Sequence, residues 1–303
     1  MAALALVTPA YAVTHAAATT QPALVYQSGG TVRVLTSDGT TLDVGTGVDG
    51  QPQHPDWSPD GERLAFETDF ATLWSVAADG SSPRRLFDCR GRCVAVQDAA
   101  WSPDGTEIAF MAARTVDGVH TSAALLRVLD VASGSVRTVH ADRTGRVWVF
   151  APRWSDDGSS LVYEEDVFAS NRLDESVVRR FRVVTIGVRG HGRRVLASWR
   201  GPFDGPGAPA PDRDGSRVVY VRHDNLVLRD LATGEVRRVT SYDASTEHAI
   251  QPTFTPDGRS VVFTHVTGTF GVDDRPRPAV IDLATGTVRD VGPAGATHPR
   301  LRP

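Results

Sequence analysis

The pentapeptide WSPDG occurs twice in this chain, at residues 57–61 and 101–105. Related segments begin at residues 154, 211 and 254 and read WSDDG, PDRDG and FTPDG. In every copy an Asp-Gly pair follows an aromatic or apolar residue, and the apolar triplet LAF, IAF, LVY, VVY or VVF follows two residues later. Asp-Gly favours tight hairpin turns, and short β-rich triplets favour strands. The repeat therefore predicts a β-hairpin that occurs five times.

A second hairpin follows each copy of the first. Segments with a central Gly-containing turn begin at residues 73, 125, 181, 226 and 279. Each complete repeat is thus expected to contain four strands. The aromatic residues that begin the repeats, Trp57, Trp101, Trp154 and Phe254, are expected to fill the wedges between neighbouring units, where burial of a large ring is favourable. The fourth repeat has Pro211 at this position, so another side chain must fill its wedge.

The two ends of the chain complement each other. Residues 23–45 contain three expected strands without the first one of a repeat, and HPRLRP from His298 matches HPDWSP from His54. A split unit of this kind is needed by a ring and not by a linear stack. The expected fold class is all-β: a six-bladed β-propeller of four-stranded antiparallel blades, closed by the C-terminal strand joining the N-terminal blade.

The repeats also resemble a known family. HPDWSPDGERLAF and QPTFTPDGRSVVF, with hairpins such as LATGEVRRVT, are similar to the WD40-like Pro-Asp repeats of TolB-like six-bladed propellers. The resemblance covers residues 23–303 and implies an exported propeller that binds partners in the cell envelope without catalysis. Related propellers accompany prolyl oligopeptidases or form sugar-acid lyases, so the resemblance predicts the fold more sharply than the function.

Residues 1–22 are expected to lie outside the propeller. A short apolar run precedes Ala10-Tyr11-Ala12, which is typical of a signal-peptide cleavage site, although no Lys or Arg precedes the run. The segment is interpreted as a truncated signal peptide, with a disordered tail as the alternative. Export agrees with a disulfide between Cys89 and Cys93, for which free thiols are the alternative. A secreted, periplasmic or envelope-associated protein is expected.

Composition limits the partners. The net charge is −4, which does not favour nucleic-acid binding, and no apolar run is long enough to predict a transmembrane segment. The expected partner is an envelope or extracellular protein, or else a carbohydrate, bound by a monomer without a cofactor. The long connections between strands all fall on one face of the ring. Four aromatic residues there are candidate partner contacts, unless they fold back over the blades: Trp148, Trp199, Phe203 and Tyr242.

The mouth of the central channel is the second candidate site. The residue three positions before each repeat aromatic should approach the axis there, and two arginines follow two residues after such positions. The candidate ligand-binding residues are His54, Asp98, Gln251, His298, Arg153 and Arg300, with Ala151 and Ala208 at the remaining positions. Imidazoles beside a carboxylate can bind a metal or act as acid and base. Alternatively, the histidines satisfy turn hydrogen bonds before proline.

The sequence therefore favours a non-catalytic binding propeller, and no catalytic residue or metal ligand is assigned. The alternative is a metal-assisted lyase or hydrolase that acts on a sugar or sugar acid at the channel mouth. The chain has no G-x-S-x-G nucleophile elbow, P-loop or G-x-G-x-x-G motif.

Overall fold

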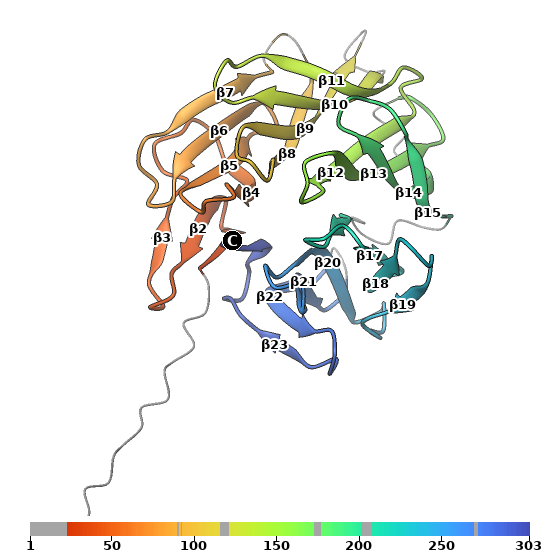
Figure 1. Ribbon diagram of the computed structural model, residues 1–303. Coiled ribbons are helices and arrows are strands. Elements are labelled where there is room, and N and C mark those ends of the chain that lie inside the picture. The colour runs from red at the N-terminus through yellow and green to blue at the C-terminus, as the bar shows by residue number, and fades with distance from the viewer. Residues whose placement is uncertain are drawn as a thin grey trace, which may run out of the picture.

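The computed structural model describes residues 23–89, 91, 93–115, 121–172, 177–200, 208–269 and 272–303. Within these ranges the chain forms 24 strands in six four-stranded sheets, and no helix. The sheets surround a common centre, and the innermost strands are β4, β8, β12, β16, β20 and β24 (Figure 1). The predicted six-bladed propeller is confirmed.

Five blades are built from consecutive strands. Blade 1 contains β4 (Pro52–Trp57), β5 (Arg63–Thr68), β6 (Thr72–Ala77) and β7 (Arg84–Asp88). Blade 2 contains β8 (Ala95–Trp101), β9 (Glu107–Thr115), β10 (Thr121–Asp130) and β11 (Val136–Asp142). Blade 3 contains β12 (Val147–Trp154), β13 (Ser160–Phe168), β14 (Val178–Gly187) and β15 (Arg194–Trp199). Blade 4 contains β16 (Ala210–Pro211), β17 (Arg217–Arg222), β18 (Asn225–Asp230) and β19 (Val236–Arg238). Blade 5 contains β20 (Glu247–Phe254), β21 (Ser260–Thr267), β22 (Arg275–Asp282) and β23 (Val288–Asp290).

Blade 6 closes the ring with strands from both ends of the chain. The C-terminal strand β24 (Thr297–Leu301) is its innermost strand, followed by β1 (Leu24–Ser28), β2 (Thr31–Leu35) and β3 (Thr41–Asp43). The pairing is antiparallel, with Leu24 opposite Leu301. The C-terminus accordingly lies near the middle of the ring beside β4 (Figure 1). This arrangement confirms the predicted closure by a split blade.

The hydrophobic core is divided among the wedges between the blades. Six clusters of buried residues are present, and each combines side chains from two neighbouring blades. Trp57 and Trp101, which are 5% and 8% exposed, lie in two of these clusters, as the repeat predicts. The indole of Trp57 also donates to the carbonyl of Arg300, and the indole of Trp154 donates to that of Ala100. The indoles of Trp57 and Trp154 therefore tie their blades to the preceding ones.

The wedge between blades 3 and 4 lacks a repeat aromatic, and a side chain from the outermost strand of blade 3 packs into it. Trp199, in the outermost strand of blade 3, is 7% exposed and lies between Phe181 and Tyr220. The ring centroids are 5.7 Å and 5.9 Å from its own, in near-parallel stacks. An aromatic from strand β15 thus contributes to the core of this wedge, at a position different from that of Pro211.

Candidate functional site at the channel mouth

The six positions expected at the channel mouth share an unusual backbone conformation. Each has a positive φ, between 34° and 61°, although none is glycine: His54, Asp98, Ala151, Ala208, Gln251 and His298. In five of the six blades the inner strand has one extra residue here relative to its neighbour, which is a β-bulge. Non-glycine residues seldom adopt this conformation, and such strain is typical of functional sites.

The bulges are tied together by side chains from the preceding blade. The Ala151 amide donates to Asp98 Oδ2 at 2.9 Å, and the Ala208 amide donates to Glu164 Oε2 at 2.9 Å. The His298 amide donates to Gln251 Oε1 at 3.0 Å. A bulge removes its amide from the strand ladder, so these side chains supply the missing acceptors. Asp98 and Gln251 therefore have a structural role as well as a position at the mouth.

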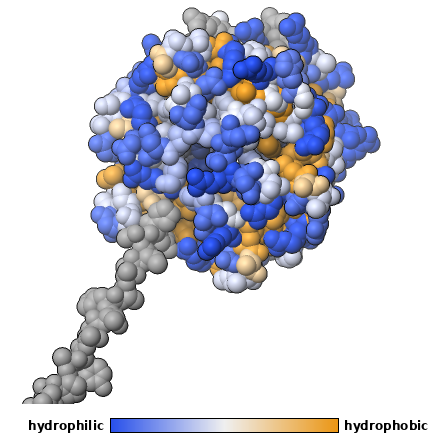
Figure 2. All heavy atoms as spheres, in the orientation of Figure 1, coloured by the Kyte–Doolittle hydropathy of each residue, from blue (hydrophilic) through white to orange (hydrophobic). Residues whose placement is uncertain are grey.

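The six residues with positive φ and two arginines line one cavity of about 280 Å³. The structure thus brings together every residue expected at the mouth, including Arg153 and Arg300. A further set of side chains lines the same cavity and was missed from the sequence: Phe70, Gln97, Phe150, Glu164 and Asp166. On the face shown in Figure 2, hydrophilic residues gather around the middle of the ring.

His54 is paired with a buried carboxylate. Its Nδ1 contacts Oε1 of Glu67, a residue with no exposed surface, and lies 3.9 Å from Asp98 Oδ1. Burial favours the neutral imidazole, but the carboxylates of Glu67 and Asp98 outweigh it and raise the pKa of His54 to about 9. Burial raises the pKa of Glu67 to about 7, against the opposing effect of His54. At neutral pH the pair contains a histidine cation.

His298 has the opposite protonation preference. Burial, with the cations His54, Arg300 and Arg153 nearby, lowers its pKa well below 6.5. The neutral ring accepts a hydrogen bond at Nε2 from the Gln251 amide, at 2.6 Å, and its Nδ1 lies 3.1 Å from the Thr297 hydroxyl. The two histidine rings meet edge to face with centroids 4.3 Å apart. A charged and a neutral imidazole therefore lie side by side at the mouth.

The two arginines form a second layer below the bulges. Arg300 is 6% exposed, and its guanidinium donates to the Pro299 carbonyl at 2.9 Å and lies 3.9 Å from Asp56. Burial and the neighbouring Arg153 lower the pKa of Arg300. Arg153 also lines a second cavity, of about 480 Å³, at the short-turn end of the channel. The arginine layer therefore separates two openings of one channel.

Metal binding at this site has no support in the geometry. The two histidines are engaged by Glu67 and Gln251, and the described part of the chain contains no group of three His, Cys, Asp or Glu side chains arranged to hold a metal. The residues as placed do not fit a metal cluster.

Three of the four aromatic residues expected to contact a partner lie in the described part of the chain and pack against other side chains of the blades. Trp199 is 7% exposed and lies in the wedge between blades 3 and 4. Trp148 is half-buried against Phe150 and Phe168, and Tyr242 stacks on His265 with centroids 4.7 Å apart. Phe203 lies outside the described residues.

Phe70 is an exposed aromatic residue at the channel mouth. It is 42% exposed, lines the cavity, and its ring centroid is 6.2 Å from that of His54. Asp69 and Phe70 form the turn between β5 and β6, with φ of 51° and 52°. Such a turn ordinarily takes Asn-Gly, and a bulky residue at positive φ is an outlier. The sequence signal was a short connection, residues 69–71, with no glycine.

Glu67 and Glu164 also had a signal in the sequence. Each directly follows the apolar triplet of its repeat, LAF and LVY, and so continues a buried strand with a carboxylate. Acidic side chains are rarely fully buried unless paired, so their position in such strands indicates a special role. Both are almost inaccessible to solvent.

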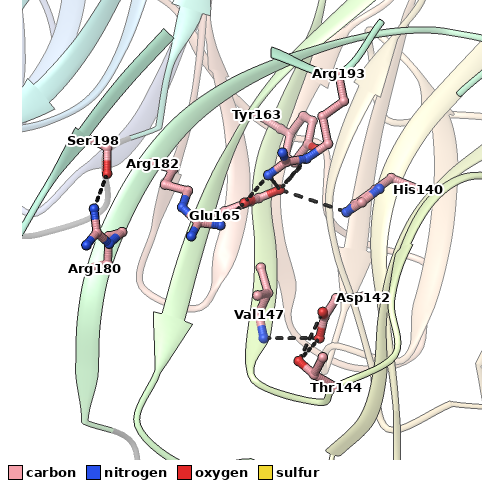
Figure 3. A network of polar contacts seen from close by, with 10 residues as sticks. All are labelled: His140, Asp142, Thr144, Val147, Tyr163, Glu165, Arg180, Arg182, Arg193 and Ser198. Atoms are coloured by element: carbon pink, nitrogen blue, oxygen red, sulfur yellow. Dashed lines mark hydrogen bonds and ion pairs between the residues drawn. The ribbon is translucent and has the colours of Figure 1, made fainter. Parts of the chain in front are cut away.

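A second carboxylate of the same strand ties blade 3 to blade 2 (Figure 3). Glu165 is 1% exposed and accepts two hydrogen bonds from Arg193 Nη2 at 2.6 Å and one from Arg182 at 3.2 Å. His140 of the neighbouring blade lies 3.9 Å away, and Tyr163 donates to the carboxylate at 3.2 Å. Because two cations compensate this charge, we interpret the network as structural.

The loop that follows β7 contains a disulfide between Cys89 and Cys93, whose Cα atoms are 5.1 Å apart. Cys89 is 2% exposed and belongs to the cluster between blades 1 and 2. Among the described residues, no helix has the length and apolar character needed to span a membrane.

Comparison with known proteins supports the fold. The chain superposes on TolB of Acinetobacter baumannii with a TM-score of 0.66 and 17% identity, covering 93% of this chain and 67% of that one. A putative TolB of Agrobacterium tumefaciens gives 0.61 at 18% identity, covering 93% and 99%. A chain of a nidogen–laminin complex gives 0.67 at 13% identity, covering 92% and 98%. The TolB-like propeller fold is therefore confirmed.

The two relatives found by sequence are both uncharacterized proteins. An uncharacterized peptidase of Bacillus subtilis, YuxL, is 27% identical over 69% of this chain and 29% of its own length. An uncharacterized Agrobacterium fabrum protein, Atu1656, is 29% identical over 41% and 45%. The chain thus spans less than half the length of either relative. No protein-family model matches the chain.

Proposed function

We propose that this chain is a non-catalytic binding propeller that holds a segment of a partner protein at the channel mouth beside Phe70. The observation that carries the proposal is the strained, exposed Phe70 at the rim of a cavity lined by polar side chains. An accessible aromatic anchor beside buried polar groups is typical of binding hot spots. Backbone strain maintained at such a position indicates selection for presentation of the ring.

Several features support binding over catalysis. The polar groups at the mouth are engaged with one another, as His54 is with Glu67 and His298 with Gln251. A propeller with the same fold occurs in a complex of two proteins, nidogen and laminin. Other propellers of similar fold are an oligogalacturonate lyase in complex with manganese and a puromycin-hydrolyzing peptidase of Mycobacterium tuberculosis. Catalysis on such substrates is therefore the alternative that the experiments must address.

Export is part of the proposal. The apolar run before Ala10-Tyr11-Ala12 is typical of a signal peptide, and the disulfide in the β7 loop suits an oxidising compartment. We expect residues 1–22, fused to alkaline phosphatase in a bacterium, to direct the enzyme to the periplasm and give activity. An inactive fusion that remains in the cytoplasm would contradict export by this segment.

The binding test uses a random peptide library displayed on phage and selected on the wild-type protein. The affinity of the selected peptides is then measured by fluorescence anisotropy on wild type, Phe70→Gly and the control Val288→Ala. Val288 is another exposed apolar residue, on the outer strand of blade 5. We expect at least a tenfold loss with Phe70→Gly, as for an anchor residue, and no change with the control.

Phe70→Gly separates binding from folding because glycine accepts positive φ without strain. The variant is expected to unfold at the same urea concentration as wild type or a higher one. Peptides that bind both proteins equally would contradict the proposal. Turnover of oligogalacturonate with Mn²⁺, or of puromycin, that is lost in His54→Ala would establish the catalytic alternative. A thermal shift with neutral or acidic oligosaccharides, lost in Phe70→Gly, would make a carbohydrate the ligand instead.

A further inference from the structure

A groove on the outer part of the ring is separate from the channel. It has a volume of about 560 Å³ and is lined by residues of β7 in blade 1 and of blade 2, namely Leu86, Phe87, Asp88, Arg114, Arg127, Gly134 and Val136. Figure 1 shows β7 beside the strands of blade 2 at the outer part of the ring. A volume in this range is sufficient for a small organic ligand. The walls combine apolar side chains with two guanidinium groups.

Among the described residues, Arg127 has no anionic partner in this groove. Its guanidinium carbon lies 5.6 Å from the centre of the Phe87 ring, in a cation–π arrangement. Its Nε is inaccessible to solvent and donates no hydrogen bond. An unsatisfied buried donor is costly, and the same guanidinium group belongs to a side chain that lines the groove.

The surroundings leave the positive charge uncompensated. Burial, with Arg114 nearby, lowers the pKa of Arg127, and neither arginine forms an ion pair with any residue that the structure describes. Asp88 is the one carboxylate in the lining, and it pairs with Arg85 at 3.3 Å. In the same blade, Arg137 is instead paired with Glu107 through bonds of 2.9 Å and 2.7 Å. The groove thus contains two arginines without ion pairs to described residues, whereas Arg137 in the same blade is neutralised by a carboxylate.

We propose that this groove binds a small organic anion whose carboxylate or phosphate contacts Arg127 and Arg114. The apolar part of the ligand lies against Leu86, Phe87 and Val136. Arginine forms paired hydrogen bonds with both kinds of anion, and these bonds are among the stronger ones in proteins. The site does not depend on the function proposed for the channel mouth.

The test titrates the full chain with phenyl phosphate, phenylacetate, inorganic phosphate and benzyl alcohol. The readouts are calorimetry and the Nε–H signal of Arg127 in NMR spectra. We expect at least one of the two aromatic anions to bind, with that signal shifting on addition. Comparing phenyl phosphate with phenylacetate tells which anionic group the groove prefers. Inorganic phosphate should bind more weakly than phenyl phosphate because it cannot use the apolar wall.

Matched variants assign the site. Arg127→Gln should weaken binding of the aromatic anion by about tenfold or more, since a charged hydrogen-bond partner is lost. Arg137→Gln should leave binding unchanged. Val136→Glu retains both arginines and places a carboxylate in the groove, so it should abolish binding while the protein stays folded. Equal affinity in wild type and Arg127→Gln, binding of benzyl alcohol as strong as that of phenyl phosphate, or no binding up to roughly 10 mM would each overturn the proposal.

Discussion

At the residue scale, the channel mouth shows how one environment produces different protonation states. His54 and His298 are neighbours, yet the carboxylates of Glu67 and Asp98 favour the cation of the first. Burial and nearby cations favour the neutral form of the second. The difference arises from the partners that each ring meets, because the two side chains occupy equivalent positions in adjacent blades.

The His54–Glu67 pair predicts a pH-dependent stability. The folded-state pKa of His54 is raised, so its stabilising contribution is present below about pH 6.5 and is lost as the pH rises through about 9. The pKa of Glu67 is also raised, so its contribution to stability likewise decreases with rising pH, between about pH 4.5 and pH 7. We expect the free energy of unfolding in urea to fall between about pH 6.5 and pH 9.

Glu67→Gln supplies the control for this prediction. Without the buried carboxylate, the pKa of His54 should fall by about one unit or more, which an NMR titration of its ring protons measures. The decline in stability over the alkaline half of the range should become smaller. An unchanged pKa would show that Asp98, and not Glu67, holds the proton on His54.

At the element scale, the inner strands are shaped by their bulges. In each of the five blades with a bulge, the bulge residue has a positive φ without being glycine, and in blade 3 it is Ala151. Ala151→Gly is expected to leave the free energy of unfolding unchanged or to raise it by up to about 1 kcal/mol, because strain is relieved. Ala109→Gly in the buried, regular strand β9 should instead cost about 1 kcal/mol. Urea denaturation of both variants measures the difference. Equal losses of unfolding free energy would contradict the prediction that the backbone at Ala151 is strained.

Trp199 provides a second test at this scale. It fills the wedge that lacks a repeat aromatic, so Trp199→Ala should destabilise the protein by about 3–5 kcal/mol. Trp148→Ala, at a half-buried position, should cost clearly less. Urea denaturation measures both losses of stability. Equal losses for the two variants would contradict our interpretation that Trp199 fills the wedge.

At the scale of the whole molecule, stability depends on closing the ring. Strand β24 pairs with β1, and the indole of Trp57 donates to the carbonyl of Arg300 within β24. Deletion of residues 297–303 exposes an edge strand and uncovers the wedge beside blade 1. We expect this variant to unfold well below the wild-type temperature, as followed by circular dichroism, and to elute as aggregates. A monomeric variant with the wild-type midpoint would show that closure contributes little.

Three cavities in the described part of the molecule are separate from one another, namely the two openings of the channel and the groove between blades 1 and 2. The arginine layer divides the channel, and Phe70 lies at one of its two openings. The groove that contains Arg127 lies away from both, between the outer strands of blades 1 and 2. Variants at the mouth and in the groove can therefore be measured independently, because sites this far apart without shared contacts usually behave additively.

The sequence was sufficient for the repeats, the number of blades, the closure by β24 and the positions that line the channel. These features depend on local signals, such as an Asp-Gly turn or an aromatic at a fixed distance from it, and on their recurrence. The wedge position of Trp199, the pairing of His54 with Glu67, the exposure of Phe70 and the uncompensated charge of Arg127 were decided only by the tertiary structure. Burial, ion pairing and presentation at a surface depend on which side chains of neighbouring blades meet, and no local pattern in the chain encodes those contacts.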